Sequence, residues 1–344
     1  MSETLSIVIP AYNEERNIAQ LIDSLRAQRT QHAEIVEIVV VASGCTDRTA
    51  QLVRERQARP GVPIVLIEEA ERRGKVAAIN TYLSERHPDV DAICLCSADL
   101  LVTRDVVESL VRCLRENSDV GMCGGRPMPT NGVGTFPGEA TRFLWQMHHR
   151  VAEESPKLGE LIMIRANLAG HLPQQCAVDE ASLEQMVCRD GYRLAYVGDA
   201  VVHNHGPETF REFLRQRRRI AAGHYWLRES SGYSVATMNA LRVVRLTLSE
   251  LGQASPRASL YILATIVTEV LSRALGYVDF LTNRDKHTIW RVSESTKQVM
   301  TDDLRPLYSH VSEQVVDATE ASATRAALGA MGASAPSAAA SHSS

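Results

Sequence analysis

The sequence predicts an α/β fold in which a parallel sheet is flanked by helices on both faces. Two observations lead to this prediction. First, short β-branched runs alternate with segments whose apolar residues recur at helical spacing, from residue 5 to residue 96. Second, these runs are mostly apolar, which is typical of parallel strands that are covered on both faces. Ligands bind such sheets at the carboxyl ends of the strands.

The first half of the chain reads as strand and helix in turn. The expected strands are Leu5–Ile9, Glu37–Val41, Ile64–Ile67 and Ala92–Cys96. Asn13 is expected to cap the first helix, and Thr46 and Asp47 the second. A third helix is predicted over Lys75–Leu83. The first helix carries apolar residues at helical spacing, which are Ile18, Leu21, Ile22 and Leu25.

The second half is less regular. Gly and Pro are frequent over Gly124–Gly170, so a loop-rich acceptor region is expected there. Further predicted elements are a helix over Ser182–Asp190, a strand over Arg193–Val197 and a basic helix over Thr209–Tyr225. After Ser234 two amphipathic helical segments are expected. Their apolar stripe consists of Leu260, Leu263, Val267, Val270, Leu271, Ala274 and Val278. From Ala321 onward the chain is mostly Ala, Ser and Gly, and disorder is expected.

Length and composition limit the function classes. The 344 residues suit one large α/β domain with an appendage, or two small domains. A net charge of -4 gives no sign of a general nucleic-acid binder. The seven cysteines are odd in number and form no CxxC pair, so structural zinc is not expected. A reducing, cytoplasmic setting fits this pattern.

No membrane segment or signal peptide is expected. The start lacks a basic segment followed by an apolar core, and Ser6–Pro10 reads as a buried strand. The nearest approach to a membrane span is Ala258–Leu281, which Glu269, Arg273 and Asp279 interrupt.

Acidic residues stand at two places where chemistry would need them. Asp99 follows a strand, where it could bind Mg²⁺ or Mn²⁺, and the alternative is a helix cap or turn residue. Asp179 and Glu180 precede a helix. Either one could act as a general base, and the alternative is that they only favour the helix N-terminus.

Basic residues and histidines follow. Gln216 and the run Arg217–Arg219 could bind phosphate, or they could form a solvated helix face. The flanking apolar side chains suggest a helix packed on the domain. His203 and His205 could complete a metal site, and the alternative is a structural role.

Six segments together resemble family-2 glycosyltransferases of the GT-A fold. They occur in the family's order over about the first two thirds of the chain, and they are IVIPAYNEE, VVVASGCTDRT, RRGKVAAIN, CSADLL, VDEASL and QRRRIAAGH. The resemblance implies a Rossmann-like, nucleotide-binding mixed sheet flanked by helices, with a helical C-terminal extension. The implied divisions are 1–230 for the catalytic domain, 231–320 for the helical region and 321–344 for the tail. Within the catalytic domain the nucleotide-sugar half is about 1–125 and the acceptor half about 126–230.

The resemblance also implies roles for single residues. Those lining the nucleotide-sugar pocket would be Pro10, Ala11, Tyr12, Asn13, Glu14, Ser43, Lys75, Ser97, Ala98 and Asp99. Asp99 matches the last Asp of the family's DXD motif and would hold the divalent metal, Mg²⁺ or Mn²⁺, with His203 or His205. Glu180, or Asp179 if the register differs, would be the base. The residues expected near the diphosphate and the acceptor are Gln216, Arg218 and Arg219.

Three departures from the family's pattern stand out. Ala42 and Ser43 occupy the positions where the family has two Asp residues, one of which contacts the nucleobase. Ser97 replaces the first Asp of the DXD motif, so a hydroxyl stands where a charge is usual. Ile220 stands where polysaccharide synthases carry Trp, which speaks against a processive polymerase.

The implied function is an inverting, single in-line transfer of a hexose from a nucleotide diphosphate sugar, UDP-linked by first expectation. The acceptor would be small, carrier-bound or lipid-linked. The alternatives are a membrane-peripheral transferase using a polyprenyl-phosphate acceptor, and a nucleotide-sugar binding protein that has lost catalysis. A nucleotidyltransferase ranks low, because PAYNEE offers no Gly-rich basic loop. The apolar stripe could touch a bilayer. We expect instead that it packs on the catalytic domain or forms a homodimer interface.

Overall fold

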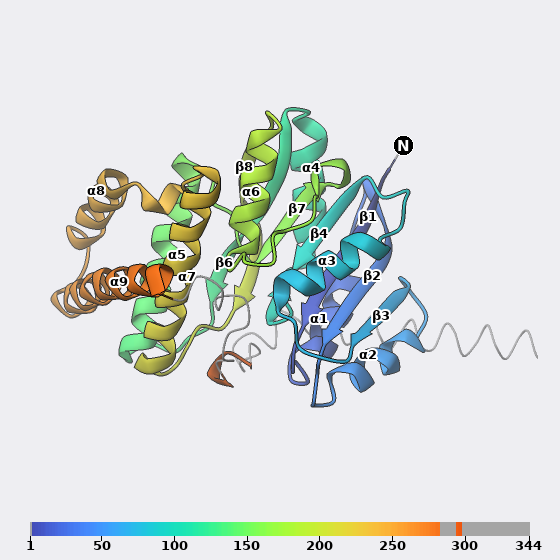
Figure 1. Ribbon diagram of the computed structural model, residues 1–344, viewed down its shortest axis with the longest axis horizontal. Coiled ribbons are helices and arrows are strands. Elements are labelled where there is room, and N and C mark those ends of the chain that lie inside the picture. Colours follow the sequence, from blue (N-terminus) through green and yellow to red (C-terminus); the bar gives the residue numbers. More distant parts are fainter. Residues whose placement is uncertain (1, 283–293, 298–344) are drawn as a thin grey trace, which may run out of the picture.

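The structure is a computed structural model, and it describes residues 2–282 and 294–297 (Figure 1). A mixed sheet of eight strands forms the centre, in the order β3-β2-β1-β4-β7-β6-β8-β5. The strands are β1 (Glu3–Ala11), β2 (Ala33–Ser43), β3 (Ile64–Glu69), β4 (Ala92–Cys96), β5 (Leu100–Val102), β6 (Val120–Pro129), β7 (Leu161–Arg165) and β8 (Arg193–Asn204). The first four pair in parallel, as predicted, whereas β7 pairs antiparallel with both β4 and β6.

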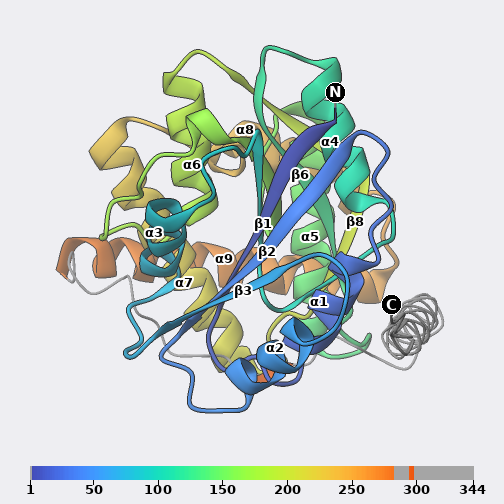
Figure 2. The ribbon, with the colours of Figure 1, turned by 90° about the vertical axis from the view of Figure 1, so that its right-hand side faces the viewer.

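Helices cover both faces of the sheet. Those bounded within the first 190 residues are α1 (Ile18–Arg26), α2 (Thr49–Gln57), α3 (Lys75–Glu85), α4 (Val106–Glu116), α5 (Phe136–Glu154) and α6 (Asp179–Arg189). Seen from the β3 edge, α1 and α4 lie on one side of the strands and α3 and α6 on the other (Figure 2). Alternate residues of β1 serve the two layers. Leu5, Ile7 and Ile9 pack with α1 and α4, and Val8 packs with α3.

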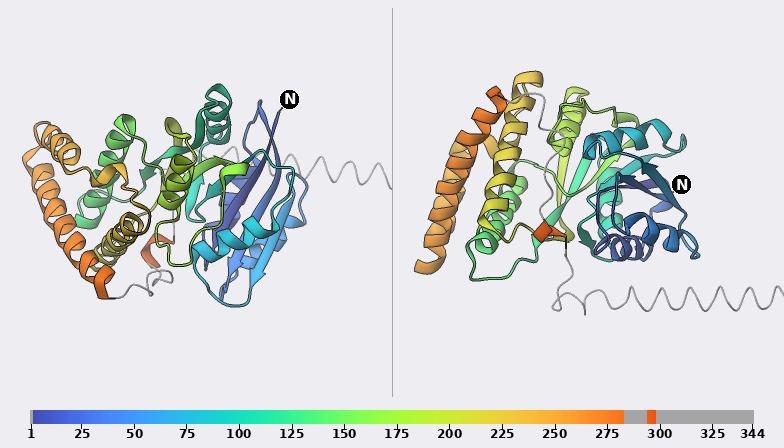
Figure 3. Two further views of the ribbon diagram at one scale, coloured as in Figure 1. Left: turned by 45° about the horizontal axis from the view of Figure 1, so that its top comes forward. Right: turned by 60° about the horizontal axis from the view of Figure 1, so that its bottom comes forward.

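The later helices form a separate layer. They are α7 (Phe210–Ser231), α8 (Ala240–Leu251) and α9 (Pro256–Thr282), with a short 3₁₀ turn at Ala236–Met238. α7 and α9 run side by side (Figure 3). Their close approach depends on Gly276, because a Cβ there would lie 2.6 Å from the carbonyl oxygen of Arg218. The predicted division near residue 230 stays a prediction, and the tail from Ala321 lies outside the described residues.

Two local predictions were wrong. Asn13 does not cap α1, which begins at Ile18; Asn13 has a φ of 53° and its side chain bonds to Thr46. The segment Gly124–Gly170 is not loop-rich, because it contains most of β6, the 19-residue helix α5 and β7. The glycines there serve packing: a Cβ at Gly125 would lie 2.5 Å from the carbonyl oxygen of Ala200 on the neighbouring strand.

The apolar stripe of α9 does not pack on the catalytic domain, which corrects the first of the two sequence-based expectations, whereas the homodimer interface stays a prediction. Val267 is 68% exposed, and the other large members of the stripe are also exposed. The buried side of α9 consists largely of small and polar residues instead, and it also includes Ile262 and Phe280, whose ring packs against Tyr225 of α7. The small and polar residues are Thr265, Thr268, Ser272 and Gly276. α9 is long and apolar enough to cross a membrane by length and composition alone.

Candidate active site

A cavity of about 1260 Å³ opens where β1, β2 and β4 end, and it continues between α5, α7, α8 and α9. Most residues predicted from the sequence line it. On the sheet side these are Pro10, Ala11, Tyr12, Glu14, Ser43, Lys75, Ser97, Ala98 and Asp99. On the helical side they are Asp179, Glu180, His205, Gln216, Arg218 and Arg219. Asn13 and His203 lie outside the lining.

The loop after β2 and the loop before α3 meet beside Tyr12. Gly44 has a φ of +63°, and a Cβ there would lie 2.3 Å from the backbone nitrogen of Arg72. The Arg72 guanidinium stacks on the Tyr12 ring with its carbon 4.0 Å from the ring centroid. The result is a flat, cationic wall at the end of β1.

Ser43 does not replace the family's acid in this wall. Its hydroxyl donates to the Glu69 carboxylate at 2.5 Å and accepts from the Arg73 amide at 3.3 Å. The carboxylate that Ser43 contacts belongs to β3, and Glu69 also accepts from Thr81 at 2.7 Å. These bonds hold the pKa of Glu69 below its ordinary value against the effect of burial.

A buried carboxylate and a distant lysine meet at the end of β1. Glu14 forms an ion pair with Lys297, whose ammonium also donates to the carbonyl oxygen of Tyr12 at 3.0 Å. The pKa of Glu14 is raised to about 7, because burial and the nearby Asp99 disfavour its charge more than Lys297 favours it. Lys297 comes from the short segment after α9, and its neighbour Ser295 donates to the carboxylate of Glu212 at 2.6 Å.

Asp99 lies directly before β5, and His205 lies directly after β8. β5 pairs antiparallel with β8, with Leu100 opposite Asn204 and Leu101 opposite His203. Continuing this register by one residue places Asp99 opposite His205. The His205 ring bonds to Thr130 at 2.7 Å and to Glu208 at 3.0 Å.

Lys75 binds both of the predicted catalytic carboxylates. Its ammonium lies 2.8 Å from Asp179 and 2.7 Å from Glu180, and it donates to the Ser97 hydroxyl at 3.4 Å. Gly74, with a φ of 94°, precedes it and lets α3 begin directly at the cavity. Burial disfavours the Lys75 charge, but the two carboxylates outweigh it and raise the pKa of Lys75.

The two carboxylates differ in their surroundings. The pKa of Asp179 is raised to about 6, because burial and the neighbouring Glu180 outweigh the opposite effect of Lys75. Burial acts in the same direction on Glu180, but Lys75 and the helix N-terminus hold its pKa well below the ordinary value. The Glu180 side chain is 19% exposed and that of Asp179 only 5%, so Glu180 is the one that a bound molecule can reach.

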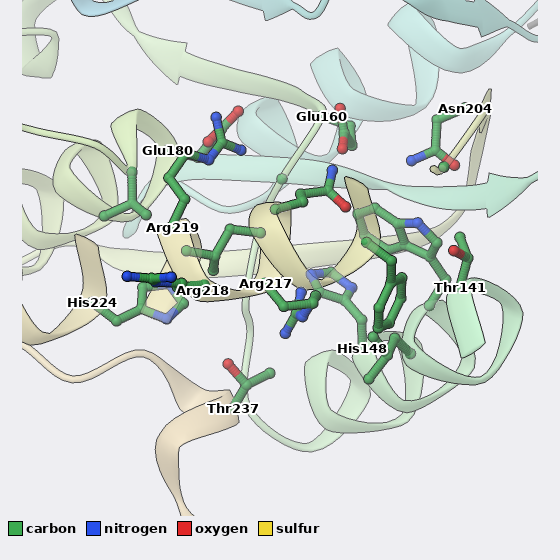
Figure 4. Close-up of a pocket in the computed structure, with 18 of the residues that line it drawn as sticks. Thr141, His148, Glu160, Glu180, Asn204, Arg217, Arg218, Arg219, His224 and Thr237 are labelled. Atoms are coloured by element: carbon green, nitrogen blue, oxygen red, sulfur yellow. The ribbon is translucent and has the colours of Figure 1, made fainter. Parts of the chain in front are cut away.

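The basic run on α7 divides among three directions, because successive residues of a helix point about 100° apart. Arg217 makes a bidentate bond to Glu269 of α9, with distances of 2.5 and 2.9 Å. Arg218 pairs with Asp279 of α9 instead of pointing to the sheet. Arg219 reaches toward Glu180 (Figure 4), and burial lowers its pKa to about 10.

Several lining residues were missed by the sequence reasoning, including Lys157, Glu160 and Lys297. Glu160 precedes β7 with a φ of 63°, an unusual conformation for a residue with a side chain. Burial raises its pKa to about 7, with Asp99 and Glu180 contributing. A single sequence carries no signal for such a backbone angle. Thr141 and Asn204 also face the cavity (Figure 4), and each has a side-chain oxygen without a hydrogen-bond partner among the described residues.

Comparison with known proteins is consistent with this arrangement. Residues 6–167 match the model described as glycosyl transferase family 2. The chain is 25% identical over 239 residues to the probable glycosyltransferase YdaM of Bacillus subtilis, covering 65% of this chain and 56% of that protein. It is 30% identical over 116 residues to the undecaprenyl-phosphate 4-deoxy-4-formamido-L-arabinose transferase of Edwardsiella ictaluri, covering 34% of this chain and 35% of that protein. The chain thus spans about half or less of the length of these curated relatives.

Among solved structures, a mannosyltransferase from Pyrobaculum calidifontis, in complex with GDP-Man and Mn²⁺, superposes with a TM-score of 0.60 at 20% identity. The match covers 82% of this chain and 88% of that one, and it shows that the fold is GT-A. The family model, which covers residues 6–167, and this fold thus agree in likening the chain to family-2 glycosyltransferases.

Proposed function

We propose that this enzyme moves a hexose from a nucleotide diphosphate sugar to an acceptor oxygen by a single in-line displacement that inverts the anomeric carbon. The observation that carries the proposal is the Lys75-bound pair Asp179 and Glu180, which lies in the same cavity as Asp99. UDP is the nucleotide that we expect first.

Glu180 is the general base of this proposal. Its depressed pKa keeps it ionised at neutral pH, and it is the more exposed of the two carboxylates. The acceptor oxygen bonds to the anomeric carbon as the bond to the diphosphate breaks, and the acceptor proton passes to Glu180. Asp179 holds Lys75 in place. The nucleoside diphosphate leaves with a negative charge that nearby cations stabilise. On α7 the candidate for this role is Arg219.

A divalent metal fits the residues at Asp99. The register of β5 and β8, continued by one residue, brings Asp99 opposite His205, and Mg²⁺ or Mn²⁺ often binds through one or two protein ligands and substrate phosphates. Within the described part of the chain no three His, Cys, Asp or Glu side chains are grouped as a metal site. The diphosphate would therefore have to supply further ligands. When bound, the metal would neutralise charge on the leaving group.

The acceptor stays open between small, carrier-bound and lipid-linked molecules. A polyprenyl-phosphate acceptor gains weight from the relative in Edwardsiella ictaluri, which is named for such an acceptor. All seven cysteines are free thiols, which agrees with a reducing cytoplasm.

A thermal-shift panel tests the donor. The protein is heated with Mn²⁺ or Mg²⁺ and UDP, GDP, dTDP or CDP, since a ligand that binds only the native state raises the melting temperature. A metal-dependent shift with one nucleotide, lost in Asp99→Asn, supports the proposal. The absence of any shift would contradict it. Binding without turnover over a broad acceptor panel would favour a protein that has lost catalysis, a reading motivated by Ala42, Ser43 and Ser97.

A further inference from the structure

The helix α9 lies at the outside of the protein, but its polar and apolar sides are reversed relative to an ordinary surface helix. Two charged residues of α9 face inward, where Glu269 binds Arg217 and Asp279 binds Arg218, whereas Arg257 in the first turn is exposed. The outward face carries large apolar side chains. On α9 these include Leu260, Val267 and Val270, which are 68%, 68% and 64% exposed. A monomeric protein in water rarely exposes a continuous apolar patch of this kind.

We call the exposed apolar side chains of the two helices α8 and α9 together the α8–α9 face. On α9 they recur every three or four residues, from Leu260 to Leu281. On α8 they are Leu241, Val244 and Leu248. The two helices lie at the end of the molecule away from β1, β2 and β3 (Figures 1 and 3). This end is free of the nucleotide half of the site.

The cavity opens through the α8–α9 face. Four residues are both exposed apolar residues of the face and part of the cavity lining, namely Val244, Leu248, Leu263 and Val270. Inside this opening the cavity is bounded by apolar side chains of α5, α8 and α9, among them Met147, Val243 and Ile266. We call this part the apolar arm. A long hydrocarbon chain could lie in the arm with its end in the apolar layer outside.

The inner end of the apolar arm is cationic. Lys157, Arg217 and Arg273 line the cavity; Arg217 bonds to Glu269, and Lys157 lies 3.5 Å from the carboxylate of Glu184. His148 and His224 complete the wall (Figure 4). Burial and these cations lower the pKa of both rings to about 3, so the rings are neutral and can donate one hydrogen bond each. His148 Nδ1 has no hydrogen-bond partner among the described residues.

We infer that the apolar arm binds a lipid phosphate as the acceptor, and that the α8–α9 face lies on the bilayer that supplies it. The tail occupies the arm and the phosphate meets the cations at its inner end, beside Glu180. The role of the lipid phosphate as acceptor rests on the proposed function, whereas its binding does not. A second copy of the chain could also cover the face, but it would close the opening of the cavity to a ligand. A bilayer covers the same rim and supplies the lipid phosphate through the opening.

Vesicle flotation tests the face. The full chain is mixed with vesicles of equimolar phosphatidylcholine and phosphatidylglycerol, and we expect it to float with them. Val267→Glu, which alters the face but not the cavity lining, should lower the bound fraction about tenfold or more, since it removes buried apolar area and adds a charge. Val65→Glu is the matched control, because Val65 is a 40% exposed valine on β3. Equal binding by the two variants, or a dimer in solution that Val267→Glu dissolves, would overturn the inference.

Binding of a soluble lipid phosphate tests the arm without any turnover. Dodecyl phosphate should bind below its micelle concentration by calorimetry, and methyl phosphate should bind at least about tenfold more weakly, because burial of the tail supplies the difference. Ile266→Trp should weaken dodecyl phosphate binding and leave the nucleotide-induced thermal shift unchanged. Equal affinities for the two phosphates would overturn the lipid site. Loss of the nucleotide shift alone would count against the proposed donor and not against this site.

Discussion

Replacement of Lys75 by methionine would leave two adjacent buried carboxylates without their shared cation. The Lys75 side chain is 20% exposed, and its ammonium lies within 2.8 Å of both Asp179 and Glu180. Removing one partner of a buried ion pair costs about 3–5 kcal/mol, because an uncompensated charge remains. We therefore expect the free energy of unfolding of Lys75→Met to fall by about 3–5 kcal/mol at pH 7.

A carboxylate left without its cation can take up a proton instead of staying charged. The cost of that protonation limits the loss of stability and makes the loss depend on pH. A carboxyl of ordinary pKa 4.5 can be protonated at pH 7 for about 3 kcal/mol, since one pKa unit is about 1.4 kcal/mol. At pH 5 the same proton costs less than about 1 kcal/mol. In the wild type the pKa of Glu180 is depressed, so its stabilising contribution is present above its unfolded pKa and is lost as the pH falls through its folded value. The variant has no such contribution to lose.

Urea denaturation at pH 7 and pH 5 measures the effect. The difference between wild type and Lys75→Met should shrink by about 2 kcal/mol at the lower pH. Arg48→Met is the control, because Arg48 pairs with Glu15 while 70% exposed, and such pairs contribute about 0–1 kcal/mol. A loss at pH 7 no larger than that of the control, or an equal loss at both pH values, would refute the reasoning.

Three further predictions concern the site. Glu180→Gln should lower kcat by about 10²–10⁴-fold with the fold intact, which steady-state kinetics and circular dichroism would check; near-normal turnover would exclude Glu180 as the base. Lys297→Gln should lower the melting temperature more at pH 8 than at pH 6. The pKa of Glu14 is already raised to about 7, so in the variant an unpaired buried charge forms only at the higher pH. An equal change of the melting temperature at both pH values would contradict this. His205→Ala should weaken activation by Mn²⁺ at least about tenfold, whereas His203→Ala should not change it, and a Mn²⁺ titration of activity separates the two.

The elements of the nucleotide half could be predicted from the sequence, because their information is local. Residues 92–96 are a fully buried strand, as the apolar run predicts, and the helix expected from Lys75 begins at Lys75. The carboxyl ends of parallel strands meet at one edge of a sheet whatever the remaining fold. For that reason Glu14, Ser97 and Asp99 were correctly expected to share a cavity.

Other features were decided only by the tertiary structure. Glycines in β6 read as loop signals, although they permit close strand packing, since composition does not reveal what lies opposite a residue. The three arginines of α7 look alike in sequence, but Asp279 pairs with Arg218 from 61 positions away. Lys297 reaches Glu14 across 283 positions.

The apolar stripe of α9 shows most clearly what the sequence determined and what it left to the tertiary structure. Helical periodicity establishes that Leu260, Val267 and Val270 share a face. It does not establish what covers that face, because burial depends on neighbours that are distant in sequence. In the folded protein the inward charges of α9 find Arg217 and Arg218, so the apolar side is left facing outward at the mouth of the cavity.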